Sequence, residues 1–287
     1  MFRFTFVVLH YITLEETIEC VESILKKVNY KYFNIVIVDN GSPNNSGSAL
    51  YKKYNDHEKV FVELNEDNLG FARGHNIGYK VAKYKLGSDF IILLNNDTII
   101  KQEEFIEKII EKYNSQQFDI LGPDIISLVD YSHQNPVRQN GLTLTELKRN
   151  TVYYSFLLLI NYLRIEDLLR KTKHFLFGER NIIEIPHNID QSNVQLHGSC
   201  LIFSPRYLER FEGLCSKTFM FMEEDILFYK SKVLNLSVLY SPDIVIYHKE
   251  DSSTNAIFNK DYKKRRFYYK NYLKSSKVLI CMMNEDE

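Results

Sequence analysis

The side chains of this chain most able to do chemistry are carboxylates that come directly after apolar runs. Asp39 follows the apolar run 34–38, and Asp97 follows the run 90–94 after two asparagines. A carboxylate fixed at a strand end can accept a hydrogen bond from a nucleotide base, or bind a hard divalent cation that neutralises a diphosphate. For either acid alone, a solvated turn or a helix cap is the alternative interpretation.

A third acidic group, Glu223-Glu224-Asp225, comes directly after the apolar residues 219–222. Apolar walls raise the pKa of a carboxyl group, which suits a general base that abstracts a proton. The alternative is the acidic first turn of a helix. His248 follows the apolar run 244–247. As a neutral imidazole it could complete a coordination sphere that Asp97 begins, and a purely structural role is the alternative.

The segment 68–78 contains three glycines and precedes a helix that we expect to reach about residue 85. It matches neither the G-x-G-x-x-G pattern nor a P-loop. Its flexible backbone and its amides ahead of a helix N-terminus could still form one wall of a ligand site.

Alternating apolar runs and amphipathic segments predict the elements that position these side chains. Continuous apolar runs suit strands covered on both faces, here 4–9, 34–38, 60–64 and 90–94. Helical spacing is found in 14–28, 46–55 and 102–113. The alternation predicts an α/β fold with a doubly wound, parallel sheet. Ligands bind such sheets at the carboxyl ends of strands, where three polar groups would meet: His10-Tyr11, Asp39 to Ser42 and Asn95 to Asp97.

The second half of the chain is less regular. We expect a helical insertion at about 141–185, either a core helix or one that faces a membrane surface or an acceptor. A loop should enter a strand at 195–203, and 238–240 and 244–247 read as short strands. The C-terminal extension 259–287 is basic and aromatic, so it could lie on anionic lipid or pack on the domain as a solvated helix.

Composition excludes several classes of protein. With 45% hydrophobic and 25% charged residues and a net charge of -1, the chain is globular, and it gives no case for nucleic-acid binding. Its four cysteines form no C-x-x-C pair, which indicates free thiols in a reducing compartment. No signal peptide is apparent, and no run reaches the roughly 18 apolar residues of a membrane span, so we expect a cytoplasmic protein.

Taken in order, several segments resemble the family 2 glycosyltransferases, in particular the rhamnosyltransferase-like branch that builds bacterial polysaccharides. The similarity extends over about residues 4–255. It rests on these segments: Val8 to Tyr11, Ile37 to Ser42, Asn68 to Ala72 with Asn76 to Gly78, Leu93 to Thr98, His197 to Cys200, Phe219 to Leu227, and Tyr247-His248 with Ser252-Ser253.

The resemblance implies a GT-A type fold, which is a mixed, mostly parallel sheet flanked by helices, in a domain spanning 1–258. It also implies an inverting transfer of a hexose from a UDP- or dTDP-linked donor to a hydroxyl of a growing, lipid-linked surface or capsular glycan. Such an enzyme would contact the inner face of the cell membrane peripherally. The donor sugar, whether rhamnose, galactose, glucose or galactofuranose, stays open, as does the oligomeric state.

The resemblance also assigns roles to residues. Asp97 and His248 would bind Mg²⁺ or Mn²⁺, and the catalytic base would be Asp225 or, as second choice, Glu224. The nucleotide-sugar would be bound by His10, Tyr11, Asp39, Asn40, Gly41, Ser42, Asn68, Gly70, Asn76, Asn95, Asn96, His197, Gly198 and Ser199. Two departures stand out: the metal motif has a single carboxylate, and His10 replaces the family's usual asparagine.

Two alternatives compete with this interpretation. A nucleotidyltransferase would need a Gly-rich, basic loop after the first strand, where this chain reads His10-Tyr11-Ile12-Thr13-Leu14. A non-catalytic, glycosyltransferase-like partner subunit would not need the acids Asp97 and Glu223 to Asp225, which this chain retains.

Overall fold

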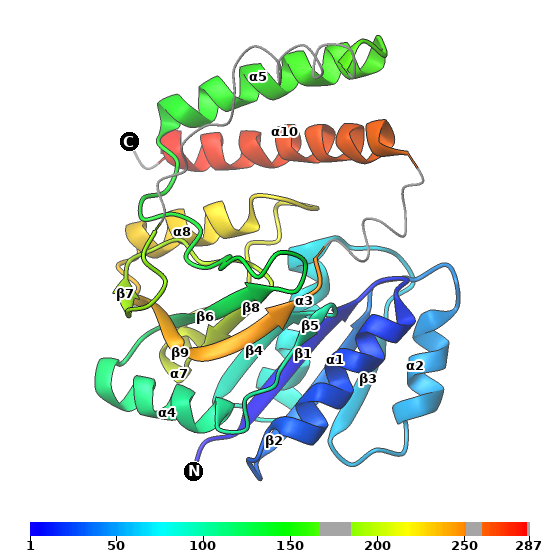
Figure 1. The fold of residues 1–287 in the computed structure, drawn as a ribbon, viewed down its shortest axis with the longest axis vertical. Helices are drawn as coiled ribbons and strands as arrows, with labels where there is room; N and C mark the ends of the chain where they lie inside the picture. Colours follow the sequence, from blue (N-terminus) through cyan, green and yellow to red (C-terminus); the bar gives the residue numbers. More distant parts are fainter. Residues whose placement is uncertain (167–184, 251–259, 286–287) are drawn as a thin grey trace.

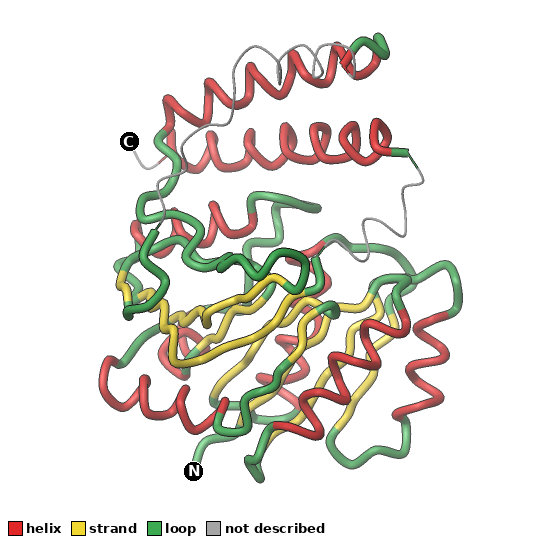
Figure 2. Tube along the Cα trace, viewed as in Figure 1, coloured by secondary structure: helices red, strands yellow, loops and turns green. Residues whose placement is uncertain are grey.

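The computed structural model describes residues 1–166, 185–250 and 260–285. Its central element is one mixed sheet (Figures 1 and 2). The strand order is β3-β2-β1-β4-β8-β6-β9-β5, and β7 pairs with β9. The strands are β1 (Phe4–His10), β2 (Phe33–Asp39), β3 (Val60–Leu64), β4 (Phe90–Asn95), β5 (Thr98–Ile99), β6 (Ile120–Ser127), β7 (Gln191–Ser192), β8 (Cys200–Phe203) and β9 (Val238–His248). The β3-β2-β1-β4 portion is parallel, and β8 joins it antiparallel to β4. The predicted parallel strands are therefore confirmed.

Helices cover both faces of this sheet. They are α1 (Leu14–Lys27), α2 (Ser46–Tyr54), α3 (Phe71–Lys80) with a π-helical turn η1 (Val81–Lys85), α4 (Phe105–Gln116), α7 (Pro205–Arg210) and α8 (Glu223–Val233). Because side chains alternate along a strand, Phe4, Phe6 and Val8 pack in the cluster of α1, α2 and α4, whereas Val7 packs with α3 and α7. This explains why β1 is apolar at nearly every position.

Two long helices form a further layer above α8 (Figure 1). They are α5 (Leu144–Tyr162) and α10 (Asp261–Glu285), which lie side by side and run in opposite directions (Figure 1). A capping box between Thr143 and Glu146 begins α5. Leu147 of α5 packs with Leu279 of α10 and with Ile226 of α8, which fixes the layer on the domain.

Some predicted boundaries were wrong. Segment 68–78 is not a loop throughout, because α3 begins at Phe71. The two short strands predicted at 238–240 and 244–247 are one strand, β9, whose pairing with β6 shifts register at Pro123/Asp124. Of the predicted insertion, α5 is described, while 167–184 lies outside the described residues. The predicted domain boundary at residue 258 falls in 251–259, which is also outside the described residues, and it stays a prediction.

Candidate active site

The carboxyl ends of β1, β2 and β4 lie side by side, as the sequence predicted. His10 is in register with Asp39, and Leu9 with Asn95. A pocket of about 520 Å³ opens at this edge. Its lining includes five residues expected at a nucleotide: Tyr11, Asp39, Gly41, Ser42 and Asn68.

Asp39 is fixed at the base of this pocket. Its carboxylate accepts a hydrogen bond from the Ser42 amide at 3.2 Å, and only 6% of the residue is exposed. Burial raises the pKa of Asp39, and the hydrogen bonds from Ser42 oppose that rise. Gly47 packs so closely that a Cβ there would lie 2.0 Å from Asp39 Oδ2. The carboxylate is therefore held in one position, where it can accept a ligand N–H.

Asn40 holds the loop that forms the neighbouring wall. Its Nδ2 donates to Asn68 Oδ1 and to the Gly70 carbonyl, both at 3.1 Å, and its Oδ1 accepts from the Leu69 amide at 3.0 Å. Gly70 has a φ of +83°, and a Cβ there would meet the Phe219 carbonyl at 2.0 Å. Asn40 is only 3% exposed and positions this wall, and its expected contact with the nucleotide-sugar stays a prediction.

Two more residues expected to contact the nucleotide are buried beneath the site. His10 is fully buried, with Nδ1 2.6 Å from Thr17 Oγ1 and Nε2 2.7 Å from Ser46 Oγ, and burial lowers its pKa to about 4. Asn96, at 4% exposure, donates to the hydroxyl oxygens of Thr13 and Thr17 at the start of α1. The ring nitrogens of His10 and the amide nitrogen of Asn96 thus bind protein groups, and contact of either residue with the nucleotide-sugar stays a prediction.

Asp97 and His248 meet beyond the end of β4, as predicted. Pairing of β5 with β9 places Thr98 opposite His248, and His248 Nε2 lies 3.1 Å from Asp97 Oδ1. The other imidazole nitrogen, Nδ1, lies 2.8 Å from Gln134 Oε1, whose amide is oriented by donation from its Nε2 to Glu250. Because an amide oxygen only accepts, Nδ1 carries a proton.

This tautomer leaves the lone pair of His248 Nε2 facing a carboxylate oxygen. A positive centre, either a proton or a divalent cation, would satisfy both groups. Ligands at adjacent positions around Mg²⁺ lie about 3 Å apart, which matches this pair. In the described part of the chain, no group of three or more His, Cys, Asp or Glu side chains is placed to hold a metal, so the Asp97–His248 pair could supply at most two ligands.

A tight turn before β8 connects this pair to the acidic cluster. The ring of His197 lies 5.8 Å from that of His248, and burial lowers the pKa of His197 to about 4. The Gly198 amide donates to Glu224 Oε1 at 3.2 Å. Ser199, only 1% exposed, accepts from the Asn95 amide through its carbonyl, which keeps the turn beside β4. Glu224 thus faces the strand ends.

The other two acids of the cluster face elsewhere. Asp225 Oδ1 accepts from Gln195 at 3.2 Å and from Arg138 at 3.4 Å, and Asp225 lines a pocket of about 340 Å³ beside α10. Glu223 is 8% exposed and accepts from the Thr218 hydroxyl, and burial raises its pKa to about 8. Burial also raises the pKa values of Glu224 and Asp225.

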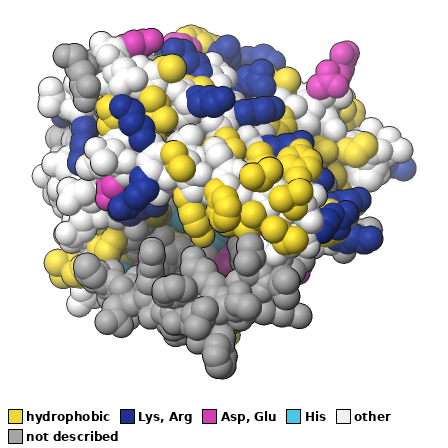
Figure 3. Space-filling model, turned by 90° about the horizontal axis from the view of Figure 1, so that it is seen from above, with side chains coloured by type: hydrophobic (Ala, Val, Ile, Leu, Met, Phe, Trp, Pro, Cys, Tyr) yellow, Lys and Arg dark blue, Asp and Glu magenta, His cyan; other side chains and the backbone are white. Residues whose placement is uncertain are grey.

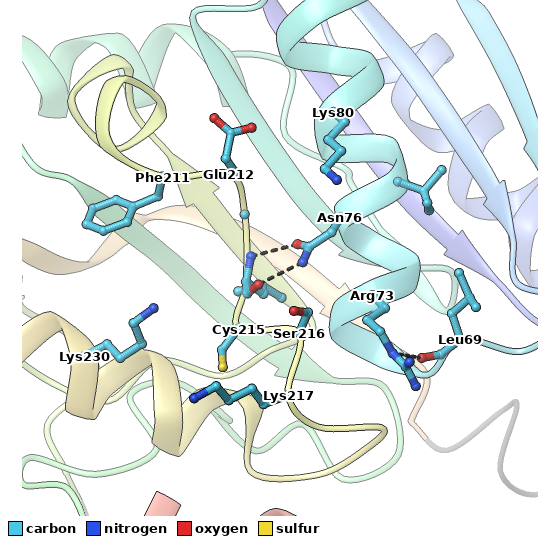
Figure 4. A pocket seen from close by; sticks show the side chains of 13 residues that line it. Leu69, Arg73, Asn76, Lys80, Phe211, Glu212, Cys215, Ser216, Lys217 and Lys230 are labelled. Atoms are coloured by element: carbon cyan, nitrogen blue, oxygen red, sulfur yellow. Dashed lines mark hydrogen bonds between the residues drawn. The ribbon is translucent and has the colours of Figure 1, made fainter. Parts of the chain in front are cut away.

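Asn76 lines a different pocket from the one at Asp39 (Figure 4). It is on α3, where Nδ2 donates to the Leu214 carbonyl at 2.8 Å and Oδ1 accepts from the Leu214 amide at 2.7 Å. It therefore anchors the loop after α7, and its expected contact with the nucleotide-sugar stays a prediction. The pocket there, of about 580 Å³, is lined by four cationic side chains among others: Arg73, Lys80, Lys217 and Lys230.

Sequence reasoning missed the residues that orient the site from a distance. Gln134 and Arg138 lie in a segment without regular structure, and their partners His248 and Asp225 are 114 and 87 residues away. No local pattern marks them. Gly47 could have been noted, since a glycine in the first turn of a helix directly after a ligand loop allows close approach.

Comparison with known proteins identifies the class. A model of "Glycosyl transferase family 2" matches residues 5–182, and the chain belongs to this family. Among curated relatives, "Glycosyltransferase GlyG" of Streptococcus pneumoniae serotype 4 is 33% identical over 111 residues, which are 39% of this chain and 35% of that protein. "Poly-beta-1,6-N-acetyl-D-glucosamine synthase" of Staphylococcus aureus (strain COL) is 35% identical over 88 residues, which are 31% of this chain and 20% of that protein. The chain thus spans about a third or less of these relatives.

Solved structures identify the fold. S. aureus TarS 1–349 in complex with UDP matches with a TM-score of 0.54 and 16% identity, covering 94% of this chain and 69% of that chain. The mannosyltransferase PcManGT from Pyrobaculum calidifontis, in complex with GDP-Man and Mn²⁺, matches with a TM-score of 0.56 and 13% identity over the same shares. The GT-A type α/β fold expected from the sequence is confirmed.

Proposed function

We propose that the protein is an inverting hexosyltransferase that moves a sugar from a UDP- or dTDP-linked donor to a hydroxyl of a growing, lipid-linked bacterial surface or capsular polysaccharide. The observation that carries the proposal is the Gly198–Glu224 contact beside the Asp97–His248 pair, at the edge where the Asp39 pocket opens. Membership of glycosyl transferase family 2 and the polysaccharide synthase among the relatives support it.

The donor would lie across the strand ends. Asp39 would accept a base N–H, with Gly41, Ser42 and Asn68 around it. Asp97 and His248 would hold Mg²⁺ or Mn²⁺, which supplies positive charge to the departing diphosphate. The TarS structure with UDP-GlcNAc and the PcManGT structure with Mn²⁺ support a nucleotide-sugar and a metal at such a site.

Glu224 is the catalytic base in this proposal. The carboxylate would take the proton of the acceptor hydroxyl as the hydroxyl oxygen bonds to the anomeric carbon, and the bond from that carbon to the diphosphate breaks with inversion. Asp225 was the first choice from the sequence, but Gln195 and Arg138 hold it on the side of α10. Its role would be to keep α8 and the segment around Arg138 in place.

The test is release of nucleoside diphosphate from a panel of UDP- and dTDP-sugars, including rhamnose, galactose, glucose and galactofuranose donors. Mg²⁺ or Mn²⁺ is present, and membranes of the source organism supply the acceptor. We expect turnover of one donor, a loss of about 100-fold or more in Glu224→Gln, and a smaller loss in Asp225→Asn. Both variants should still bind UDP. Turnover that survives in Glu224→Gln but not in Asp225→Asn would reverse the assignment. Folded protein that turns over no donor would favour the non-catalytic partner subunit.

A further inference from the structure

The outer face of α5 carries a stripe of exposed apolar side chains. Val152, Phe156, Leu159 and Leu163 follow the helical repeat, and they are 72%, 54%, 57% and 60% exposed. Further exposed apolar residues of this region extend the stripe: Tyr153, Tyr162 and Ile165. In the view from above, hydrophobic side chains gather in one patch with Lys and Arg beside it (Figure 3). A contiguous apolar patch of this kind marks an interaction surface.

The stripe is not the side of α5 that packs on the domain. Leu147 and Tyr154 take that role, with the Tyr154 ring 4.2 Å from that of Tyr272 and 5.6 Å from that of Tyr268 on α10. Tyr268 and Tyr272 of the C-terminal extension therefore face α5, and the exposed apolar side chains of this layer are those of α5.

Cations border the stripe. Five basic residues of α10 recur at helical spacing on one face: Lys263, Arg266, Lys270, Lys274 and Lys277. The Arg266 guanidinium lies 4.0 Å and the Lys270 amine 5.4 Å from the ring centroid of Tyr162 at the end of α5. This face of α10 is therefore next to the apolar stripe.

Within the described helices, α5 has no acidic residue after Glu146, and α10 has none between Asp261 and Glu285. Between Leu147 and Ile165 the sequence has three basic residues and no acid, and between Tyr262 and Asn284 it again has no acid. Glu166 is 2% exposed and contacts Arg265, so its charge is turned inward. Apolar side chains bordered by positively charged side chains are complementary to an anionic lipid surface.

We propose that this surface, formed by the α5 stripe and the basic face of α10, docks on an anionic bilayer. The α5 side chains enter the boundary between headgroups and acyl chains, and the α10 cations contact the phosphates. No helix in the described ranges is long and apolar enough to cross a membrane. A second copy of the chain fits less well, because joining two such faces would bring like charges together.

Flotation of the purified full chain with vesicles tests the proposal. We expect binding to phosphatidylcholine vesicles that contain phosphatidylglycerol, weak binding to phosphatidylcholine alone, and release by high salt. Neutralising two cations in Lys270→Gln with Lys274→Gln should lower partitioning about 30-fold at low salt. Phe156→Ser with Leu159→Ser should lower it at any salt concentration. The matched control, Tyr51→Ser with Lys52→Glu on exposed positions of α2, should bind like the wild type.

Three results would overturn the proposal. One is equal partitioning on both vesicle types, and another is no binding to either. The third is a concentration-dependent dimer in sedimentation that disappears in Phe156→Ser with Leu159→Ser, which would identify a second copy as the occupant. Thermal unfolding of each variant verifies that it is folded. Retained UDP binding in solution separates a failure of membrane docking from a failure of the proposed transferase activity.

Discussion

Replacing Gly198 by alanine should slow catalysis by moving a carboxylate that belongs to another element. A Cβ at this position would lie 2.4 Å from Glu224 Oε1 and 3.0 Å from Cδ, whereas ordinary contacts begin at 3.4 Å. The Glu224 carboxylate must therefore move by about 1 Å. It would also lose its 3.2 Å hydrogen bond from the Gly198 amide.

A displacement of about 1 Å at a reacting group costs roughly 100-fold in rate, so we expect kcat to fall by about that factor. The KM of the donor should change little, because the Asp39 pocket is not touched. Overpacking of this size costs about 1–3 kcal/mol of stability, which leaves the protein folded.

The assay is steady-state release of nucleoside diphosphate, with Gly141→Ala as control. A Cβ at Gly141 would lie 2.9 Å from Phe228 Cδ1, so this variant strains α8 one turn beyond Glu224 without touching the Glu224 carboxylate. We expect a similar fall in Tm for both variants and a large fall in kcat for Gly198→Ala only. A wild-type kcat in Gly198→Ala, or equal losses in the two variants, would refute Glu224 as a base positioned by this turn.

Three further predictions concern the nucleotide pocket and the core. Gly47→Ala should weaken UDP binding in calorimetry at least tenfold, because its Cβ would lie 2.0 Å from Asp39 Oδ2; an unchanged Kd would mean that Asp39 does not bind the nucleotide. Asn40→Ala removes the three hydrogen bonds that hold the loop 68–70, so the free energy of unfolding measured in urea should fall by about 2–3 kcal/mol. The variant should also bind UDP more weakly. Unchanged UDP affinity would contradict the positioning role of Asn40. Burial lowers the pKa of His75 to about 3 from 6.5, so the unfolded chain takes up a proton that the folded protein does not, and stability falls as pH drops below 6.5. His75→Phe should flatten that loss in Tm, whereas an unchanged pH profile would show that His75 is not its source.

The sequence predicts the parallel half of the sheet well because two signals agree there. Continuous apolar runs define β1, β2 and β4, and polar residues end each run at the same edge. By contrast, β6 contains Gly122-Pro123-Asp124, which reads as a turn. The strand tolerates Pro123 because its pairing with β9 shifts register at that point.

The site is harder to predict than the fold because residue type does not show which way a side chain faces. His10 and Asn40 are polar residues at strand ends, as a ligand site requires, yet both turn inward and bind protein groups. The direction of Glu224 and Asp225 depends on where α8 begins, after Met222 with a φ of 67°. A shift of one residue on a helix turns a side chain by about 100°.

Calorimetric titration of UDP and dTDP, with and without Mn²⁺, tests the central claim that Asp39 and Asp97 hold the two ends of one nucleotide diphosphate. We predict binding of at least one nucleotide that Mn²⁺ strengthens. Asp97→Asn should abolish the gain from Mn²⁺ but not binding itself, and Asp39→Ala should weaken binding with or without Mn²⁺. Folded wild-type protein that binds neither nucleotide, or a gain from Mn²⁺ that persists in Asp97→Asn, would contradict the account.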